Sequence, residues 1–257
     1  PMYRDESGNG FDNYVAELSL KKGLYRYYFV MDGVTYEHFI GMGENRRPSL
    51  FYDNVRPYQL SVYKKIYQTP TWLNKGVMYQ IFVDRFCASG KAVPNEDKIM
   101  RNWGEQPYFR DEDGVVLNRD FFGGDLEGVI SKLPYLRSLN VSTIYLNPIF
   151  KAYSNHKYDT EDYETIDPMF GTQQDFERLC AEAHNLGIHV ILDGVFNHVG
   201  SSSKYFNREG KYGDEGAYRD PKSPYRDWFN FRPDGSYECW WNFRTLPRIN
   251  ARSKSAQ

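Results

Sequence analysis

The sequence lacks the features that mark several classes of protein. Its three cysteines, Cys87, Cys180 and Cys239, are odd in number and do not have the spacing of a metal site, so neither a disulfide framework nor a zinc site is expected. No apolar run is long enough to cross a membrane. The net charge of −2 and the absence of a basic block argue against nucleic acid as a partner.

A cytoplasmic location is the expectation from this cysteine content. No secretory leader is visible in the sequence. The chain begins at Pro1 rather than at a methionine, however, so the removal of a leader and an extracellular location stay open as alternatives.

Aromatic residues are what the sequence has in excess. They make up 17% of the chain, with 22 tyrosines and 5 tryptophans. Their rings combine a flat apolar face with a polar tip, which suits sugar rings, because these have apolar C–H faces and hydroxyls around the edge. An aromatic core would explain the same composition, so composition alone leaves both interpretations open.

Residues 1–68 have the pattern of a β-rich module without helical periodicity. Residues 24–31 and 60–67 are rich in strand-forming residues, and Asp32-Gly33 supplies a tight turn. The pattern predicts a small β-sandwich that lacks its first strands. Pro70, in the Thr-Pro-Thr run at 69–71, denies the chain a continuing ladder and marks the linker.

From residue 77 onward, predicted strands alternate with predicted helices. The strands are expected at 77–83, 141–146 and 189–192, the helices at 125–140 and 172–187, and long loops at 87–120 and 147–169. This order predicts an α/β fold with parallel strands. Residues 194–250 show no clear helix or buried strand, which indicates a functional loop or a small subdomain.

Polar residues follow the third predicted strand directly. Asp193, Asn197 and His198 lie at its carboxyl end, where polar chemistry collects in parallel α/β sheets and barrels. A turn cap at Asp193 and ordinary loop polars at the other two positions are the structural alternative.

Three other clusters follow predicted strands or precede a helix. Asp-Arg-Phe at 84–86 suits an ion pair with a structural role. Phe-Gly-Gly-Asp at 122–125 lacks the spacing of a dinucleotide fingerprint, so phosphate binding is disfavoured there. Asn-His-Lys-Tyr-Asp-Thr at 155–160 follows the second strand.

In this order and spacing, the clusters resemble the α-amylase superfamily of glycoside hydrolases. The resemblance rests on Asp-Gly-Val-Phe-Asn-His at 193–198 and Leu-Pro-Arg-Ile-Asn at 246–250. Met-Tyr-Gln-Ile-Phe at 78–82 with 84–86, His-Lys-Tyr-Asp at 156–159 and Tyr-Glu-Cys-Trp-Trp at 237–241 are similar to the neopullulanase, type II pullulanase and cyclomaltodextrinase branch.

The resemblance implies a partial (β/α)₈ TIM barrel preceded by an immunoglobulin-like, carbohydrate-binding-type β-sandwich. Residues 1–68 would be the sandwich, 69–193 the first three strands of the barrel, and 194–257 the irregular subdomain after the third strand. The whole protein would be a retaining hydrolase of α-glucans such as starch, pullulan and maltooligosaccharides, cleaving α-1,4 bonds, with α-1,6 bonds left open.

Individual residues take their expected roles from the same resemblance. Tyr158 would stack on the sugar at the cleavage subsite, while His156 and His198 would bind sugar hydroxyls. Asp193 would support the site rather than react. The further expected glucan contacts are Tyr153, Asn197, Trp240 and Trp241, although the two tryptophans suit packing within the subdomain equally well.

The reacting carboxylates of the family come from signatures after the fourth, fifth and seventh strands, and none of these signatures is present up to Gln257. We therefore expect the chain to be a fragment that is inactive alone. The alternatives are a non-catalytic glucan-binding protein and an amylase-like accessory subunit. The resemblance leaves a homodimer open for the full-length protein.

Calcium is the one cofactor that the resemblance suggests. The Gly123 carbonyl and Asp125 match half of the calcium site found in this branch. The usual Asn-Gly-Asp of the other half is missing, although Asn95 and Asp97 follow nearby.

Overall fold

The computed structural model describes residues 1–5, 10–33, 36–65, 68–74, 76–92, 94, 98–108, 110, 114–116 and 118–257. The chain divides into two compact units, Pro1–Thr69 and Pro70–Gln257. Among the described residues, no helix has the length and apolar character needed to cross a bilayer.

The first unit is built from short antiparallel strands. β1 (Tyr3–Arg4) pairs with β2 (Tyr14–Val15), β3 (Gly23–Tyr27) with β7 (Tyr58–Val62), and β5 (Glu37–Met42) with both β4 (Phe29–Asp32) and β6 (Pro48–Phe51). The described residues of this unit form no α-helix, in agreement with the missing helical periodicity. The predicted turn at Asp32-Gly33 follows β4, while Val34 and Thr35 lie outside the described residues.

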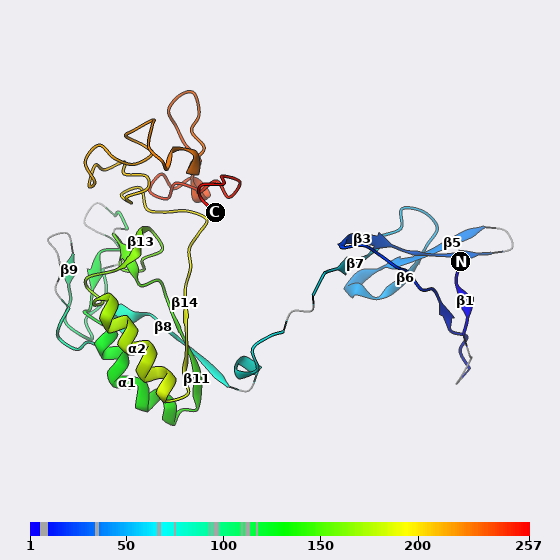
Figure 1. Cartoon of the computed structure of the whole chain (residues 1–257), viewed down its shortest axis with the longest axis horizontal. Helices are drawn as coiled ribbons and strands as arrows, with labels where there is room; N and C mark the ends of the chain where they lie inside the picture. The colour runs from blue at the N-terminus through cyan, green and yellow to red at the C-terminus, as the bar shows by residue number, and fades with distance from the viewer. Residues whose placement is uncertain are drawn as a thin grey trace. The chain divides into compact units, whose positions relative to one another are not determined.

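A parallel three-stranded sheet organises the second unit. β11 (Val141–Leu146) lies between β8 (Val77–Ile81) and β14 (His189–Leu192) and is parallel to both. The three predicted strands are therefore confirmed, and their carboxyl ends lie at one edge of the sheet, as parallel strands require. Figure 1 shows these strands with α1 and α2 beside them.

The helices α1 (Leu126–Ser138) and α2 (Gln173–Asn185) begin at side-chain caps that the sequence supplies. Asp125 Oδ1 accepts from Gly128 N at 2.7 Å, and Thr172 forms a reciprocal capping box with Asp175. The helices pack on each other and on the sheet through one apolar core. This core includes Leu126, Val129, Leu133 and Leu136 of α1, Leu179 and Ala183 of α2, and Ile81, Ile144 and Leu146 of the strands.

The predicted loop at 147–169 contains strands, so that prediction is wrong. β12 (Phe150–Ala152) pairs antiparallel with β13 (Thr160–Ile166), and the connection between them carries the His-Lys-Tyr-Asp run. In the described part of the predicted loop at 87–120, the regular structure consists of β9 (Ile99–Met100) and β10 (Asp120–Phe121), a two-residue parallel pair.

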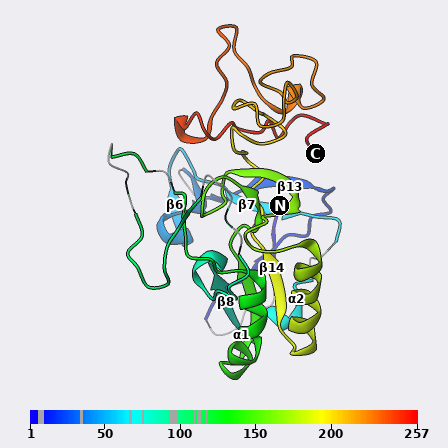
Figure 2. The same cartoon turned by 90° about the vertical axis from the view of Figure 1, so that its left-hand side faces the viewer.

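Residues 194–257, the segment expected to form a subdomain, contain no α-helix and no regular strand. Figure 2 shows this segment, from yellow to red, beyond the end of β14. It contains the short 3₁₀ helices Arg226–Trp228 and Trp240–Asn242, and isolated bridges such as His198 with Arg248. Its own small core includes Val199, Phe206 and Phe229, so the subdomain has an apolar centre separate from that of the sheet and helices.

Candidate functional site

Tyr158 and Asp193 meet at the carboxyl ends of the parallel strands. The Tyr158 hydroxyl donates to Asp193 Oδ2 at 2.8 Å. Asp193 directly follows β14, and its backbone N–H donates to the carbonyl of Leu146, the last residue of β11, at 3.0 Å. Burial, together with the hydrogen bond and charge of Asp193, raises the pKa of Tyr158 to about 12. The phenol therefore stays protonated at neutral pH and keeps donating to the carboxylate.

The side chain of His198 forms a hydrogen bond with the backbone of Tyr158. Its Nε2 lies 3.1 Å from the Tyr158 carbonyl oxygen, and because a carbonyl only accepts, Nε2 carries the proton. The residue is 4% exposed, and its Nδ1 is buried with no hydrogen-bond partner among the described residues. Burial lowers the pKa of His198, so the ring is neutral at pH 7 and its Nδ1 is an acceptor without a donor.

His156 offers the opposite hydrogen-bonding function. The backbone N–H of Tyr158 donates to His156 Nδ1 at 3.0 Å, which places the ring proton on Nε2. Burial lowers the pKa of His156 as well. The His156 and Tyr158 rings lie 5.8 Å apart between centroids. A neutral donor at His156 and a neutral acceptor at His198 thus flank Tyr158, an arrangement that suits hydroxyl groups rather than charged ligands.

Lys157 fixes the backbone between His156 and Tyr158, and no pattern in the sequence indicated this role. It has a left-handed backbone (φ 59°), and its ammonium lies 2.6 Å from Asp167 Oδ2. Asp167 in turn accepts from the backbone N–H groups of Ala152 and Met169 at 3.3 and 3.0 Å. A lysine in a polar run gives no sequence signal for complete burial, because burial here depends on a partner ten residues away.

Asp84 has a structural role in the neighbouring loop. It is fully buried, and its carboxylate accepts from the backbone N–H groups of Phe122 and Gly123 at 3.1 to 3.2 Å. Burial raises the pKa of Asp84, while those two hydrogen bonds act in the opposite direction. At Gly124, a Cβ atom would lie 2.0 Å from the Val83 carbonyl oxygen, so the second glycine is required by close packing.

The described residues do not by themselves fit a calcium site. Asp125, the one carboxylate predicted to bind the metal, caps α1 through Oδ1 and accepts from the Ser89 hydroxyl through Oδ2. No group of three or more His, Cys, Asp or Glu side chains that could hold a metal occurs in the described part of the chain. Asn95 and Asp97 lie outside the described residues. Calcium binding stays a prediction.

Trp240 and Trp241 form a stacked pair next to His198. The Trp240 ring stacks on the His198 ring at 5.1 Å, and Trp241 stacks on Trp240 at 4.8 Å with 2° between the ring planes. Trp241 is 78% exposed and has a left-handed backbone (φ 46°), which costs a non-glycine residue about 1 kcal/mol or more. Trp240 thus packs against the site, while one face of Trp241 is open to a ligand.

Tyr153 and Asn197 both have interactions within the protein. The ammonium groups of Lys98 and Lys211 lie 5.4 and 5.2 Å from the centre of the Tyr153 ring. Asn197 is exposed, and its carbonyl accepts from Ile249 N at 2.9 Å, so its backbone is paired with the last part of the subdomain. Sugar contacts at both residues stay predictions.

Comparison with known proteins gives a consistent family. The family described as "Alpha amylase, catalytic domain" matches residues 80–250. The amylopullulanase of Thermoanaerobacterium saccharolyticum is 44% identical over 254 residues, which cover 89% of this chain and 20% of that protein. The cyclomaltodextrinase of Thermoanaerobacter pseudethanolicus is 37% identical over 250 residues, which cover 96% of this chain and 39% of that protein.

A solved structure matches the chain at the level of the backbone. The cyclic α-maltosyl-(1→6)-maltose hydrolase of Arthrobacter globiformis, in complex with cyclic α-maltosyl-(1→6)-maltose, superimposes with a TM-score of 0.61 at 31% identity. The match covers 73% of this chain and 40% of that protein. The chain therefore spans less than half the length of each of these three proteins.

Proposed function

The chain belongs to the α-amylase family, whose catalytic domain is a TIM barrel, and on this premise we propose that it forms the substrate-contacting wall of a retaining α-glucan hydrolase. The substrates would be maltooligosaccharides, starch or pullulan, and the whole protein would cleave α-1,4 bonds and, as the second linkage, α-1,6 bonds. The ligand named for the Arthrobacter globiformis hydrolase, a cyclic maltosyl-maltose, supports this substrate class.

The arrangement around Tyr158 carries the proposal. Its hydroxyl is held by Asp193 and its carbonyl by His198, so the ring has a fixed orientation before any ligand enters. A ring face fixed in this way can stack on a glucose ring and shield positive charge that develops during bond cleavage. Because the Tyr158 hydroxyl and carbonyl already form hydrogen bonds, the binding of a glucan costs little further conformational entropy of this side chain.

The histidines would bind the hydroxyl groups of the same sugar. His156 supplies an Nε2–H donor, and His198 supplies Nδ1 as an acceptor that has no partner among the described residues. Both side chains have a lowered pKa through burial, so both act as neutral groups at pH 7. Neutral imidazoles suit a neutral glucan, since they orient hydroxyls without bringing an uncompensated charge into the site.

The remaining parts of the family architecture are also proposed for the whole protein. The reacting carboxylate and its partner acid would come from barrel strands other than β8, β11 and β14. The antiparallel strands of residues 1–69 would belong to a β-sandwich module of carbohydrate-binding type. A homodimer, a cytoplasmic location and inactivity of the chain alone stay predictions.

Reducing-end release from maltohexaose and pullulan by the complete gene product tests the proposal. Tyr158→Ala and His198→Ala should each lower turnover at least about tenfold, since each removes a contact worth more than about 1 kcal/mol. Tyr135→Ala is the matched control, because Tyr135 lies in α1 and is 54% exposed. Wild-type turnover in both site variants would remove the site assignment. Binding without release would favour a glucan-binding protein instead.

A further inference from the structure

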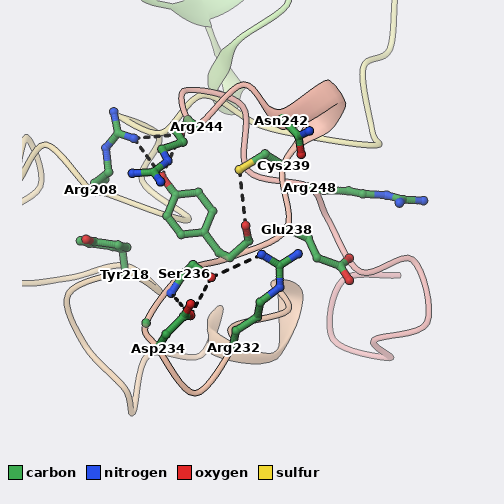
Figure 3. Close-up of a pocket in the computed structure, with 12 residues that line it drawn as sticks. Arg208, Tyr218, Arg232, Asp234, Ser236, Glu238, Cys239, Asn242, Arg244 and Arg248 are labelled. Atoms are coloured by element: carbon green, nitrogen blue, oxygen red, sulfur yellow. Dashed lines mark hydrogen bonds between the residues drawn. The ribbon is translucent and has the colours of Figure 1, made fainter.

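A cavity lies in the irregular subdomain, and its lining is rich in arginine. It has a volume of about 850 Å³ and lies between residues 208 and 248. Four arginines and two carboxylates line it, although the whole chain carries a net charge of −2. Figure 3 shows Arg208 and Arg244 beside each other, and Arg232 next to Ser236 on the side of the pocket that carries Asp234, whereas Arg248 extends away from these three arginines. The pocket therefore carries a local positive charge, although the net charge of the chain is slightly negative.

The backbone around the pocket is held in place, while two guanidinium groups have no acidic partner. The Arg244 carbonyl accepts from Arg208 Nη1 at 2.9 Å and from the Tyr237 hydroxyl at 2.8 Å. In the described part of the chain, neither the Arg232 nor the Arg244 side chain forms an ion pair within 4.0 Å. Among the described residues, the Arg232 guanidinium donates only one long hydrogen bond, from Nη1 to Ser236 Oγ at 3.4 Å. Fixed backbones with available guanidiniums are what an anion site requires.

The acidic groups nearby leave this positive charge largely uncompensated. Asp234 accepts from the Ser236 hydroxyl at 2.7 Å and from its backbone N–H at 2.9 Å. These bonds, followed by the charge of Arg232, lower the pKa of Asp234, so it is ionised at neutral pH. Glu209 pairs with Arg208 at 2.7 Å. One arginine is thus matched to Glu209. Of the two carboxylates that line the pocket, Asp234 is affected by the charge of Arg232, and Glu238 accepts from Asn230 Nδ2 at 3.0 Å.

Cys239 lines the same pocket as these arginines and lies within electrostatic range of three of them. Burial raises the pKa of its thiol, and the charges of Arg244, Arg208 and Arg232 act together in the opposite direction. Three guanidinium groups therefore lie close enough to one sulfur atom to affect its ionisation. Two residues further along, Trp241 exposes its ring at the neighbouring site. The pocket and the stacked tryptophans are parts of one surface segment, residues 237–241.

We propose that this pocket binds a phosphate monoester carried on an α-glucan chain, with Arg232 and Arg244 as the phosphate ligands. Guanidinium groups bind phosphate oxygens in a bidentate manner, and two of them match the charge of a phosphate dianion. The volume exceeds the needs of a single phosphate and lies within the range of pockets for organic ligands, which favours phosphate attached to a sugar. The glucan part of this inference rests on the proposed function.

Calorimetric titration of the full chain with three probes tests the inference. The probes are inorganic phosphate, neutral maltohexaose, and maltohexaose with a 6-phosphate on one glucose. The phosphorylated sugar should bind at least about tenfold more tightly than the neutral one, because charge-assisted hydrogen bonds to phosphate add to the sugar contacts. The double variant Arg232→Gln/Arg244→Gln should abolish this difference and leave the affinity for neutral maltohexaose unchanged.

Arg252→Gln is the matched control, because it removes one exposed positive charge of the same subdomain outside the pocket. This variant should keep the preference for the phosphorylated sugar. Equal affinity of the wild type for both sugars would overturn the inference. So would an equal loss in the control variant, which would indicate net charge alone. Inorganic phosphate that binds as tightly as the phosphorylated sugar would overturn the glucan part.

The thiol of Cys239 gives a readout that does not depend on sugar binding. Inorganic phosphate should slow alkylation of Cys239 by neutral iodoacetamide, followed by peptide mass, and leave Cys87 and Cys180 unaffected. If neither sugar binds but phosphate protects Cys239 alone, the proposed function fails and the anion site stands. If phosphate protects none of the three thiols, the anion site itself is overturned.

Discussion

The Lys157 ammonium lies 2.6 Å from Asp167 Oδ2, and these side chains are 0% and 4% exposed. The pair lies within an aromatic enclosure, with the Phe170 and Phe121 rings 4.6 and 5.2 Å from the ammonium. It anchors the left-handed residue between His156 and Tyr158 to the end of the β12–β13 hairpin. The geometry of the two sugar-contacting side chains therefore depends on a buried ion pair that itself contacts no sugar in our proposal.

Lys157→Met should destabilise the chain by about 3 kcal/mol or more, because it leaves the Asp167 carboxylate buried without its counter-charge. Urea unfolding of the full chain measures the effect. Lys132→Met is the control, since Lys132 lies exposed on α1 and should change stability by less than about 0.5 kcal/mol. Lys157→Met/Asp167→Asn should recover part of the loss. A Lys157→Met variant as stable as the control would show that the pair is not formed.

Tyr158→Phe isolates the hydrogen bond to Asp193 from the stacking ring. The variant keeps the ring face but loses the 2.8 Å bond to a carboxylate, so kcat/KM of the complete gene product on maltohexaose should fall about tenfold, which is less than the fall in Tyr158→Ala. Tyr135→Phe, at an exposed position of α1, should leave kcat/KM unchanged. A fall as large as that in Tyr158→Ala would mean that the hydroxyl matters more than the ring, contrary to the stacking role.

The buried histidines predict how stability depends on pH. Burial lowers the pKa of both His156 and His198 below the ordinary value of 6.5. The unfolded chain therefore binds protons at a higher pH than the folded chain does, and the free energy of unfolding should fall as the pH falls below 6.5. Above pH 6.5, both histidines are neutral in the folded and the unfolded chain, and their contribution to the free energy of unfolding is fully present. In His156→Gln/His198→Gln, the fall between pH 6.5 and 5 should be shallower, as measured by urea unfolding. An unchanged slope would contradict the burial of these rings.

Asp125→Ala should cost about 1 kcal/mol, because it removes the side-chain cap of α1. Asp214→Ala, which removes a fully exposed carboxylate, should cost less than about 0.5 kcal/mol. Thermal unfolding of both variants in calcium and in magnesium tests the metal prediction at the same time. A calcium site requires a rise in Tm that is specific to calcium and absent in Asp125→Ala. If calcium and magnesium change the Tm equally, the calcium prediction is wrong and Asp125 acts only as a helix cap.

The sheet and helices of the second unit could be predicted because their signals are local. The apolar runs of β8, β11 and β14 have strand length, and Thr172, Asp175 and Gly187 mark the ends of α2. The β12–β13 hairpin could not, because Thr160–Ile166 is rich in acidic residues that normally indicate a loop. Glu161 is nevertheless buried, because Ser202 and Lys211 bind it from the subdomain. Such pairing depends on contacts about 40 or 50 residues away, which no local pattern contains.

The motifs named residues that the structure brings together, but they did not contain the geometry between them, and the roles of these residues stay predictions. Tyr158, Asp193 and His198 all followed from the motifs, and the structure brings them together. The tautomers of the histidines depend on backbone groups of Tyr158 that only the folded chain presents. The positive-φ backbone of Trp241 and the burial of Lys157 likewise arise from tertiary contacts.

The measurement that tests the central claim most directly is proton NMR of maltohexaose during cleavage by the complete gene product. A retaining α-glucan hydrolase releases new reducing ends first in the α-configuration. We expect α-anomer to accumulate before β-anomer, with the rate at least about tenfold lower in Tyr158→Ala. Initial release of β-anomer, or no release from either maltohexaose or pullulan, would contradict the account.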